Sequence, residues 1–193
     1  MTQITRDRLR LAINERDYAP RLPDSGLVLA GVLVPLFIKD GQDHVLLIKR
    51  SDSSHRHAGE IAFPGGVKEE SDPSILFTAL REAYEEVGID KKDVEVIGEL
   101  DPAVTSQQFK ISPFVGVFPY PYVYRICKDE VSDILEVPVS SLLDPKNFYI
   151  EQREHNGRLF DTYFYNYRGH SIWGATARIL RQLLLLGYSE LEK

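Results

Sequence analysis

Hydrophobic positions along this chain of 193 residues follow a helical period at first and a strand-like pattern afterwards. Residues 4–16 alternate charged and aliphatic positions at helical spacing, which predicts a short N-terminal helix. Apolar runs at 27–38 and 44–49 are separated by Asp40 and Gly41, and they predict two strands joined by a turn. The first quarter of the chain is therefore expected to contain a helix followed by paired strands.

The clearest helical period follows a polar loop and occupies residues 73–87. Four apolar side chains are spaced i, i+3, i+4 and i+7 and share one predicted core-facing side: Leu80, Ala83, Tyr84 and Val87. Asp72 followed by Pro73 is typical of a helix N-cap and the first helical position. Gly88 is suited to end the helix in a left-handed conformation.

The remaining pattern predicts further strands and one more helix. The other short elements are four strands and a helical turn, expected at 61–63, 94–100, 111–118, 129–137 and 139–143. Asn156-Gly157 lies between runs at 147–153 and 159–167 and is a strong hairpin signal. A final amphipathic helix is expected at about 174–186. Strands mixed with two substantial helices indicate an α+β fold, a mixed α/β/α sandwich.

Composition and charge limit the classes of function that the chain can serve. With 43% hydrophobic residues the chain can bury one full core, so one domain is the default expectation. The formal net charge of −6 disfavours nucleic acid and anionic membranes as partners, because both attract basic surfaces. Cys127 is the sole cysteine, which excludes an intramolecular disulfide and fits a reducing cytoplasm. The apolar run at 183–186 is too short to span a bilayer, so we expect no membrane segment.

Three glutamates on the predicted helix form the strongest chemical signal. Glu82, Glu85 and Glu86 are spaced i, i+3 and i+4, and like charges at this spacing repel one another. Charge runs are usually solvated, but solvated faces tend to alternate in sign, and this face offers Arg81 alone as a cation. Gly65-Gly66 lies one loop upstream and permits a close approach to a ligand. A hard divalent cation, magnesium or manganese, is therefore expected beside the glutamates.

Residues 66–89 resemble the loop-helix-loop signature of the Nudix hydrolases. That signature has a glycine, five residues, a glutamate, seven residues and then Arg-Glu-aliphatic-x-Glu-Glu-x-Gly-aliphatic. The matching positions are Arg81, Glu82, Ala83, Glu85, Glu86, Gly88 and Ile89. The upstream half departs, because fourteen residues instead of thirteen separate Gly66 from Arg81, and Pro73 occupies the glutamate position. Three acids stand nearby instead: Glu69, Glu70 and Asp72.

Further segments resemble the coenzyme A pyrophosphatase branch of that family. The upstream element comprises residues 46–51 and 56–60 and leads into Phe63-Pro64-Gly65-Gly66. Residues 172–180 are similar to the last helix of the branch. These matches are specific to the branch, whereas the glutamate helix belongs to the whole family.

The resemblance spans residues 27–187 and implies a domain organisation. We expect an N-terminal helix and arm at 1–26, a Nudix hydrolase domain at 27–187 and a short tail at 188–193. The fold that the resemblance implies is the Nudix fold, with a mixed sheet between helices.

The same resemblance implies metal-dependent hydrolysis of a nucleoside diphosphate linked to another group. Glu82, Glu85 and Glu86 would bind Mg²⁺ or Mn²⁺, and the Gly66 carbonyl would add a ligand. The metal would bridge the phosphate oxygens and acidify a bound water. Arg81 would orient the glutamates through charge-assisted hydrogen bonds.

For coenzyme A the expected products are 4′-phosphopantetheine and 3′-phosphoadenosine 5′-phosphate. The substrate-binding candidates are Arg50, Arg56, His57, Gly65 and Gly66. The planar fork of arginine suits a phosphate, although surface charge is an equal alternative for each cation. Trp173, Tyr163 and Tyr165 either stack on the adenine or belong to the core or its rim.

Several points stay open at the level of sequence. The base that accepts a proton from water is one of the motif glutamates or an acid from a later loop. Glu130 and Glu136 are candidates for such an acid, unless they form a solvated strand face. ADP-ribose, dinucleotides or nucleoside triphosphates are alternative substrates, and a noncatalytic nucleotide-binding domain is a further alternative. The expected partner is a small nucleotide diphosphate in the cytoplasm, and a homodimer is compatible with the sequence.

Overall fold

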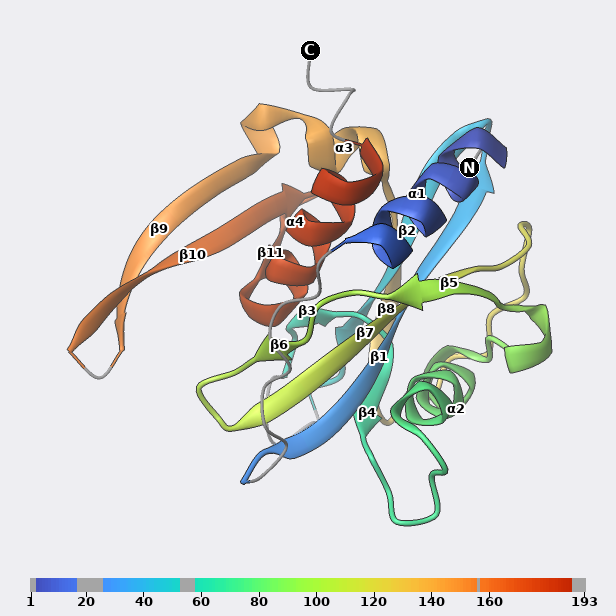
Figure 1. Ribbon diagram of the computed structural model, residues 1–193, viewed down its shortest axis with the longest axis horizontal. Helices are drawn as coiled ribbons and strands as arrows, with labels where there is room; N and C mark the ends of the chain where they lie inside the picture. Colours follow the sequence, from blue (N-terminus) through green and yellow to red (C-terminus); the bar gives the residue numbers. More distant parts are fainter. Residues whose placement is uncertain (1–2, 17–25, 53–57, 156, 189–193) are drawn as a thin grey trace.

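The computed structural model describes residues 3–16, 26–52, 58–155 and 157–188. Four α-helices and two 3₁₀ turns are present in these ranges: α1 (Gln3–Glu15), α2 (Ile75–Val87), α3 (Val139–Leu143), α4 (Gly174–Tyr188), η1 (Lys91–Asp93) and η2 (Pro145–Asn147). Among these helices, none combines the length and the hydrophobicity that crossing a membrane requires. The helices lie on both sides of a large twisted sheet (Figure 1).

The large sheet contains the first eight strands. They are β1 (Val28–Lys39), β2 (Gln42–Arg50), β3 (Ile61–Ala62), β4 (Gly65–Val67), β5 (Glu95–Glu99), β6 (Ala103–Val104), β7 (Phe109–Val117) and β8 (Val131–Pro138). The central order is β3-β2-β1-β7-β5, while β4 pairs with β1, β6 with β7 and β8 with β2. Strands β1 and β7 are parallel, and the other pairs are antiparallel. The predicted mixed sheet is therefore confirmed.

A second sheet of three antiparallel strands follows in the C-terminal half. Its order is β11-β10-β9, from β9 (Phe148–His155), β10 (Arg158–Tyr167) and β11 (His170–Trp173). The β9–β10 hairpin matches the one predicted around Asn156-Gly157 and extends away from the body of the molecule (Figure 1). Strand β11 was not predicted, because four residues carry little periodicity. It is reached through Arg168 and Gly169, whose φ values of 48° and 80° suit a tight hairpin turn.

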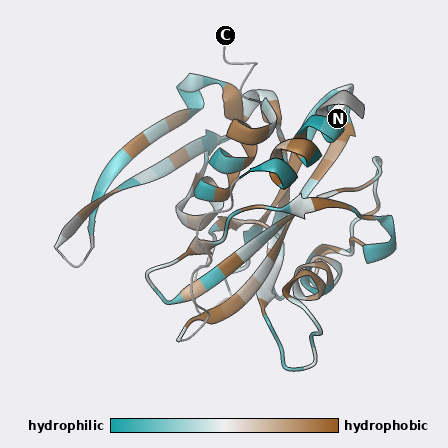
Figure 2. Cartoon of the chain, viewed as in Figure 1, coloured by the Kyte–Doolittle hydropathy of each residue, from teal (hydrophilic) through white to brown (hydrophobic). Residues whose placement is uncertain are grey.

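Two hydrophobic layers flank the large sheet. On one side, Leu33 and Phe37 of β1 pack with Ala83 and Val87 of α2. On the other side, alternate residues of β1 join α1 and α4 in the larger cluster. Hydrophobic positions accordingly run along the central strands in Figure 2. This arrangement confirms the α/β/α sandwich, because each helix layer buries one face of the sheet.

The start and the rotation of α2 differ from the prediction. Ser74, not Asp72, is the N-cap, and its Oγ accepts a hydrogen bond from Phe77 N at 3.1 Å. Tyr84 was predicted in the core but is 47% exposed, whereas Glu86 is buried. The helix presses its small residues onto Gly31 of β1, where an added Cβ would lie 3.1 Å from Ala79 N. This close approach turns Tyr84 outward.

The end of α2 agrees with the prediction. Gly88 adopts φ 79° and donates from its N–H to Tyr84 O at 2.9 Å. A left-handed residue after the last turn satisfies carbonyls that the helix leaves open. The helix that carries the candidate glutamates is therefore fixed at its C-terminal end.

Candidate active site

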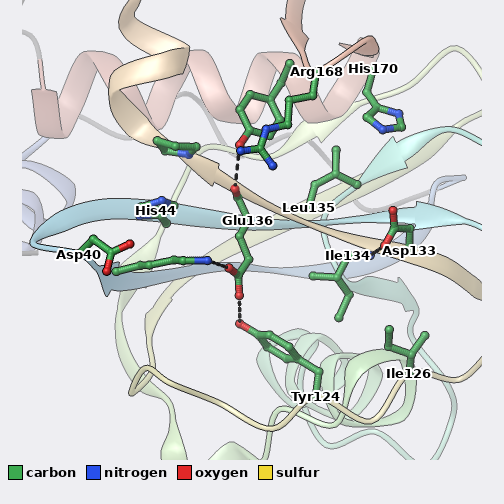
Figure 3. A pocket seen from close by; sticks show the side chains of 13 residues that line it. Asp40, His44, Tyr124, Ile126, Asp133, Ile134, Leu135, Glu136, Arg168 and His170 are labelled. Carbon is green, nitrogen blue, oxygen red and sulfur yellow. Dashed lines mark hydrogen bonds and ion pairs between the residues drawn. The ribbon is translucent and has the colours of Figure 1, made fainter.

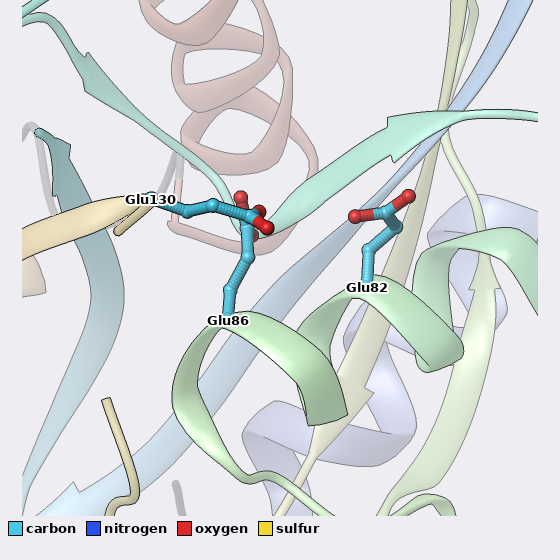
Figure 4. A group of neighbouring side chains, drawn as sticks. All are labelled: Glu82, Glu86 and Glu130. Carbon is cyan, nitrogen blue, oxygen red and sulfur yellow. The ribbon is translucent and has the colours of Figure 1, made fainter. Parts of the chain in front are cut away.

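Three carboxylates from two separate segments meet above the central sheet. Glu82 and Glu86 project from α2, and Glu130 approaches from the turn before β8 (Figure 4). One oxygen of each lies within 4.8 Å of the others. Carboxylate oxygens are the ligands that hard divalent cations prefer, and the repulsion among three carboxylates so close is relieved either by a proton or by a bound cation. The chemistry of this donor set therefore fits Mg²⁺ or Mn²⁺.

Glu86 is the most deeply placed of the three, with only 1% of its surface exposed. Burial raises the pKa of Glu86 to about 8, and the charges of Glu82 and Glu130 act in the same direction. The Arg50 guanidinium and the Gly65 N–H, which donates to Glu86 Oε2 at 2.9 Å, oppose this increase. Without a bound cation this carboxyl group therefore keeps its proton at neutral pH, so a cation at the cluster would have to displace it.

Glu82 lies directly against the backbone of β4. A Cβ added to Gly66 would lie 2.8 Å from Glu82 Oε2 and closer still to the rest of that carboxylate. Burial is the main reason that the pKa of Glu82 is raised, and Arg81, with Nη1 2.9 Å from Glu82 Oε1, opposes it. Gly65 and Gly66 are part of β4 and pair with β1. The absence of a side chain at Gly66 leaves room for the carboxylate.

Arg81 connects the glutamates to a buried aspartate. Its Nε and Nη2 donate to the two oxygens of Asp72 at 3.1 and 3.0 Å. Its Nη1 lies 2.9 Å from both Glu82 and Glu85. The hydrogen bond from Arg81 holds the pKa of the Asp72 carboxyl well below its usual range, and the same bond raises the pKa of Arg81. Arg81 therefore orients the glutamates, and its own position is fixed by the two hydrogen bonds to Asp72.

Asp72 is the upstream acid that the sequence left undecided. It is buried and also accepts hydrogen bonds from Thr78 Oγ1 at 2.9 Å and from Glu69 N at 3.0 Å. Five residues separate Gly66 from Asp72, which is the spacing of the glycine and the glutamate in the Nudix signature. The extra residue therefore falls between Asp72 and Arg81, and an aspartate takes the place of the glutamate.

Glu85 lies outside the close carboxylate group. Its side chain is 50% exposed and pairs with Arg81 at 2.9 Å. Helix geometry explains the separation, because Glu82 and Glu86 are one turn apart on the same side, while Glu85 is rotated towards Arg81. Its role as a metal ligand stays a prediction.

The predicted substrate-binding residues are only partly described. Arg50, at the end of β2, is partly buried, and its Nη2 donates to Gly65 O at 3.5 Å. Its charge also acts on Glu86, which places Arg50 beside the carboxylate group. Arg56 and His57 lie outside the described residues.

The aromatic candidates divide between the core and the surface. Tyr165 is buried, and Tyr163 packs against the larger core cluster, so both contribute to folding. Trp173 is 38% exposed and stacks on Phe164, with the Arg153 guanidinium 5.3 Å from its ring. Trp173 is therefore the most exposed of the three.

A cavity of about 570 Å³ lies along β8, away from the three clustered carboxylates (Figure 3). Glu136 occupies its centre, where Lys39 Nζ pairs with it at 2.7 Å and the Tyr124 hydroxyl donates to it at 3.3 Å. Asp40, Asp133 and Glu136 outnumber the Lys and Arg residues that line this cavity. Glu136 is held in an ion pair and a hydrogen bond, and the lining of this cavity contains none of the three clustered carboxylates, so the cavity is separate from the candidate reaction site.

The position of Glu130 could not be read from a local pattern. The turn that carries it is closed by Glu130 N, which donates to Cys127 O at 3.0 Å, and Cys127 N donates to Glu86 O at 2.9 Å. Ser51 N donates to Glu130 O at 2.9 Å and ties the turn to the end of β2. These long-range bonds bring Glu130 to α2, and its isolated position in the sequence carried no more than a weak signal.

Known proteins resemble this chain in sequence. The NUDIX domain model matches residues 29–154. The uncharacterized Nudix hydrolase NudL of Photorhabdus laumondii is 41% identical over 154 residues, which cover 80% of this chain and 82% of the relative. NudL of Enterobacter sp. is 37% identical over 159 residues and covers 81% of each chain.

Solved structures show the same fold at low sequence identity. A MutT/nudix family protein from Enterococcus faecalis superposes with a TM-score of 0.54 at 13% identity, over 96% of this chain and 73% of that one. An Ap4A hydrolase of C. elegans gives a TM-score of 0.51 at 16% identity, over 61% of this chain and 84% of that one. The domain match and the relatives together lead to one conclusion: the chain belongs to the Nudix hydrolase family.

Proposed function

We propose that this protein hydrolyses the diphosphate of coenzyme A, or of a coenzyme A derivative, to 4′-phosphopantetheine and 3′-phosphoadenosine 5′-phosphate. The observation that carries the reaction class is the group of Glu82, Glu86 and Glu130, whose oxygens lie within 4.8 Å of one another. The substrate rests on residues 46–51 and 63–66, which resemble the coenzyme A pyrophosphatase branch. Family membership supports a diphosphate hydrolase, and the branch resemblance supports the narrower assignment.

The proposed metal ligands are Glu82, Glu86 and Glu130, with Glu85 and the Gly66 carbonyl as additional candidates. Mg²⁺ or Mn²⁺ bound there would neutralise the charge of the diphosphate and acidify water. Glu130 is exposed and adjoins both α2 carboxylates, so it offers an accessible acceptor for the proton of the attacking water.

Two arginines have separate proposed roles. Arg81 is a positioning residue, since its guanidinium is shared by Asp72, Glu82 and Glu85 and is not left free for substrate. Arg50 is a candidate to meet a substrate phosphate, because it lies beside the carboxylate group and arginine suits phosphate geometry. Arg56 and His57 are proposed as further phosphate contacts from the branch resemblance alone.

Product identification tests this proposal directly. The purified protein is incubated with coenzyme A and magnesium or manganese, and the products are identified by mass spectrometry. We expect both predicted products in equal amounts, and about 100-fold less of each, or lower still, with the Glu86→Gln variant. Matched reactions with ADP-ribose, a dinucleotide and a nucleoside triphosphate test the choice of substrate separately from the hydrolase activity. If ADP-ribose is hydrolysed and coenzyme A is not, coenzyme A is refuted as the substrate but the diphosphate hydrolase activity stands. Inactivity on every substrate would favour a noncatalytic nucleotide-binding domain.

The remaining assignments are also proposals. We place the Nudix hydrolase domain at residues 27–187, with residues 1–26 as an N-terminal helix and arm and 188–193 as a tail. A small-molecule substrate in the cytoplasm, without nucleic acid or membrane as a partner, is consistent with the net charge of −6.

A further inference from the structure

The β9–β10 hairpin has one strand edge without a partner. Among the described residues, β9 pairs with β10 on one side and with no strand on the other. The hairpin projects beyond the body of the molecule, so no helix lies along that edge (Figure 1). Side chains 149–154 of β9 are exposed. A long unpaired edge of this kind is a template for pairing with another strand.

The unpaired edge of β8 differs from that of β9, because side chains bond to its backbone groups. Ile134 N donates to the side chain of Asp133 at 2.8 Å, and the Tyr167 hydroxyl donates to Glu136 O at 3.2 Å. These side chains hydrogen-bond to the backbone groups of β8 that a further strand would need for pairing. Within the part of the chain that the structure describes, no side chain bonds to the outer backbone groups of β9. The β9 edge is therefore available for pairing, whereas the β8 edge is blocked.

The hairpin also exposes apolar side chains on both of its faces. The register pairs Ile150 with Tyr163 and Arg153 with Phe160, so alternation places Ile150 and Leu159 on one face and Phe160 on the other. The exposed fractions are 48% for Ile150, 65% for Leu159 and 51% for Phe160. Of these three side chains Ile150 alone lies on β9, where a strand paired along the free edge would partly cover it.

The charges along β9 are arranged so that they complement a second copy of this chain. Glu151 and Arg153 flank Gln152 on one face of the strand and lie 3.2 Å apart. If two β9 strands pair antiparallel about a two-fold axis at Gln152, Glu151 of each copy lies opposite Arg153 of the other. Opposite charges directly across a strand pair are favourable, and a two-fold interface requires this self-complementarity.

We propose that two copies of this chain associate by pairing their β9 strands antiparallel about Gln152, which joins their small sheets into one six-stranded sheet. The interface is isologous and adds no strand edge that a third copy could use, so it closes at a dimer. The association does not depend on the proposed substrate, because it uses none of the clustered carboxylates.

Charge exchange tests the register. Glu151→Arg and Arg153→Glu each place two pairs of like charges across the interface, whereas the double variant restores both opposite-charge pairs. By sedimentation equilibrium we expect a wild-type dimer, a dissociation constant raised about tenfold or more in each single variant, and recovery in the double variant. Glu70→Arg, on the exposed loop after β4, is the matched control and should dimerise like the wild type. A monomeric wild type, or single variants that dimerise normally, would overturn the proposal.

The charge variants also act within one chain, because each breaks the Glu151–Arg153 pair and Arg153→Glu removes the guanidinium from the rings of Phe164 and Trp173. A cysteine scan tests the interface independently of these contacts. In a Cys127→Ser background, Gln152→Cys places two thiols on the two-fold axis with Cβ atoms about 5 Å apart, close to disulfide range. Glu154→Cys places them about 14 Å apart in the same register. We expect rapid oxidation to a covalent dimer for Gln152→Cys and little for Glu154→Cys. Equal cross-linking of both variants, or of neither, would exclude the β9 pairing.

Discussion

Replacing Gly66 with alanine should displace the Glu82 carboxylate and reduce activity while leaving the stability of the fold almost unchanged. The added Cβ would lie 2.8 Å from Glu82 Oε2 and closer to the rest of the carboxylate, whereas ordinary contact begins at 3.4 Å. The carboxylate therefore has to retreat by about 1 Å, and a displacement of that size at a reacting centre can cost about 100-fold in rate. The obstacle is the end of a flexible side chain, so we expect less than about 1 kcal/mol of lost folding stability.

The assay combines kcat/KM for the identified substrate, Mn²⁺ affinity by calorimetry and stability by urea unfolding. Gly31→Ala is the matched control, because its Cβ would lie 3.1 Å from Ala79 N and closer to the Ile75 carbonyl, both backbone atoms of α2. That variant should lose about 1–3 kcal/mol of stability, since a helix cannot rotate away as a side chain can. Wild-type kcat/KM and Mn²⁺ affinity in Gly66→Ala would refute the idea that Gly66 sets the position of Glu82.

Two further variants test the rest of the site. Glu86→Gln should reduce turnover by about 100-fold or more, and Glu85→Gln should reduce it less, because Glu86 belongs to the clustered carboxylates and Glu85 contacts Arg81. Equal losses of turnover in steady-state assays would contradict this ranking. Asp72→Asn should destabilise the protein in a pH-dependent way. The pKa of Asp72 is lower in the folded protein than its ordinary 3.8, so its stabilising effect is complete above that value and declines as the pH falls below it. Urea unfolding should therefore show a wild-type advantage at neutral pH that shrinks below about pH 4, and an advantage that is constant with pH would contradict the assignment.

Most elements and one part of the site follow from local patterns. The helical period places α2 and α4 within a few residues of their ends, and Asn156-Gly157 marks the β9–β10 hairpin. Glu82 and Glu86 lie side by side because residues four apart on a helix are neighbours whatever surrounds them. Gly88 ends α2 because a left-handed residue is needed there, which is again a local requirement.

The contacts between distant segments needed the folded chain. Glu130 reaches Glu86 because β8 pairs with β2 and the turn before it bonds to α2, and no periodicity in the sequence encodes that meeting. Asp72 becomes the partner of Arg81 instead of a helix cap because the loop folds under the helix. Tyr84 points outward because α2 packs closely on Gly31, so the rotation of the helix follows from shape and not from hydrophobicity alone. Local periodicity thus places two of the three clustered carboxylates, while strand pairing and close packing bring in the third and orient all of them.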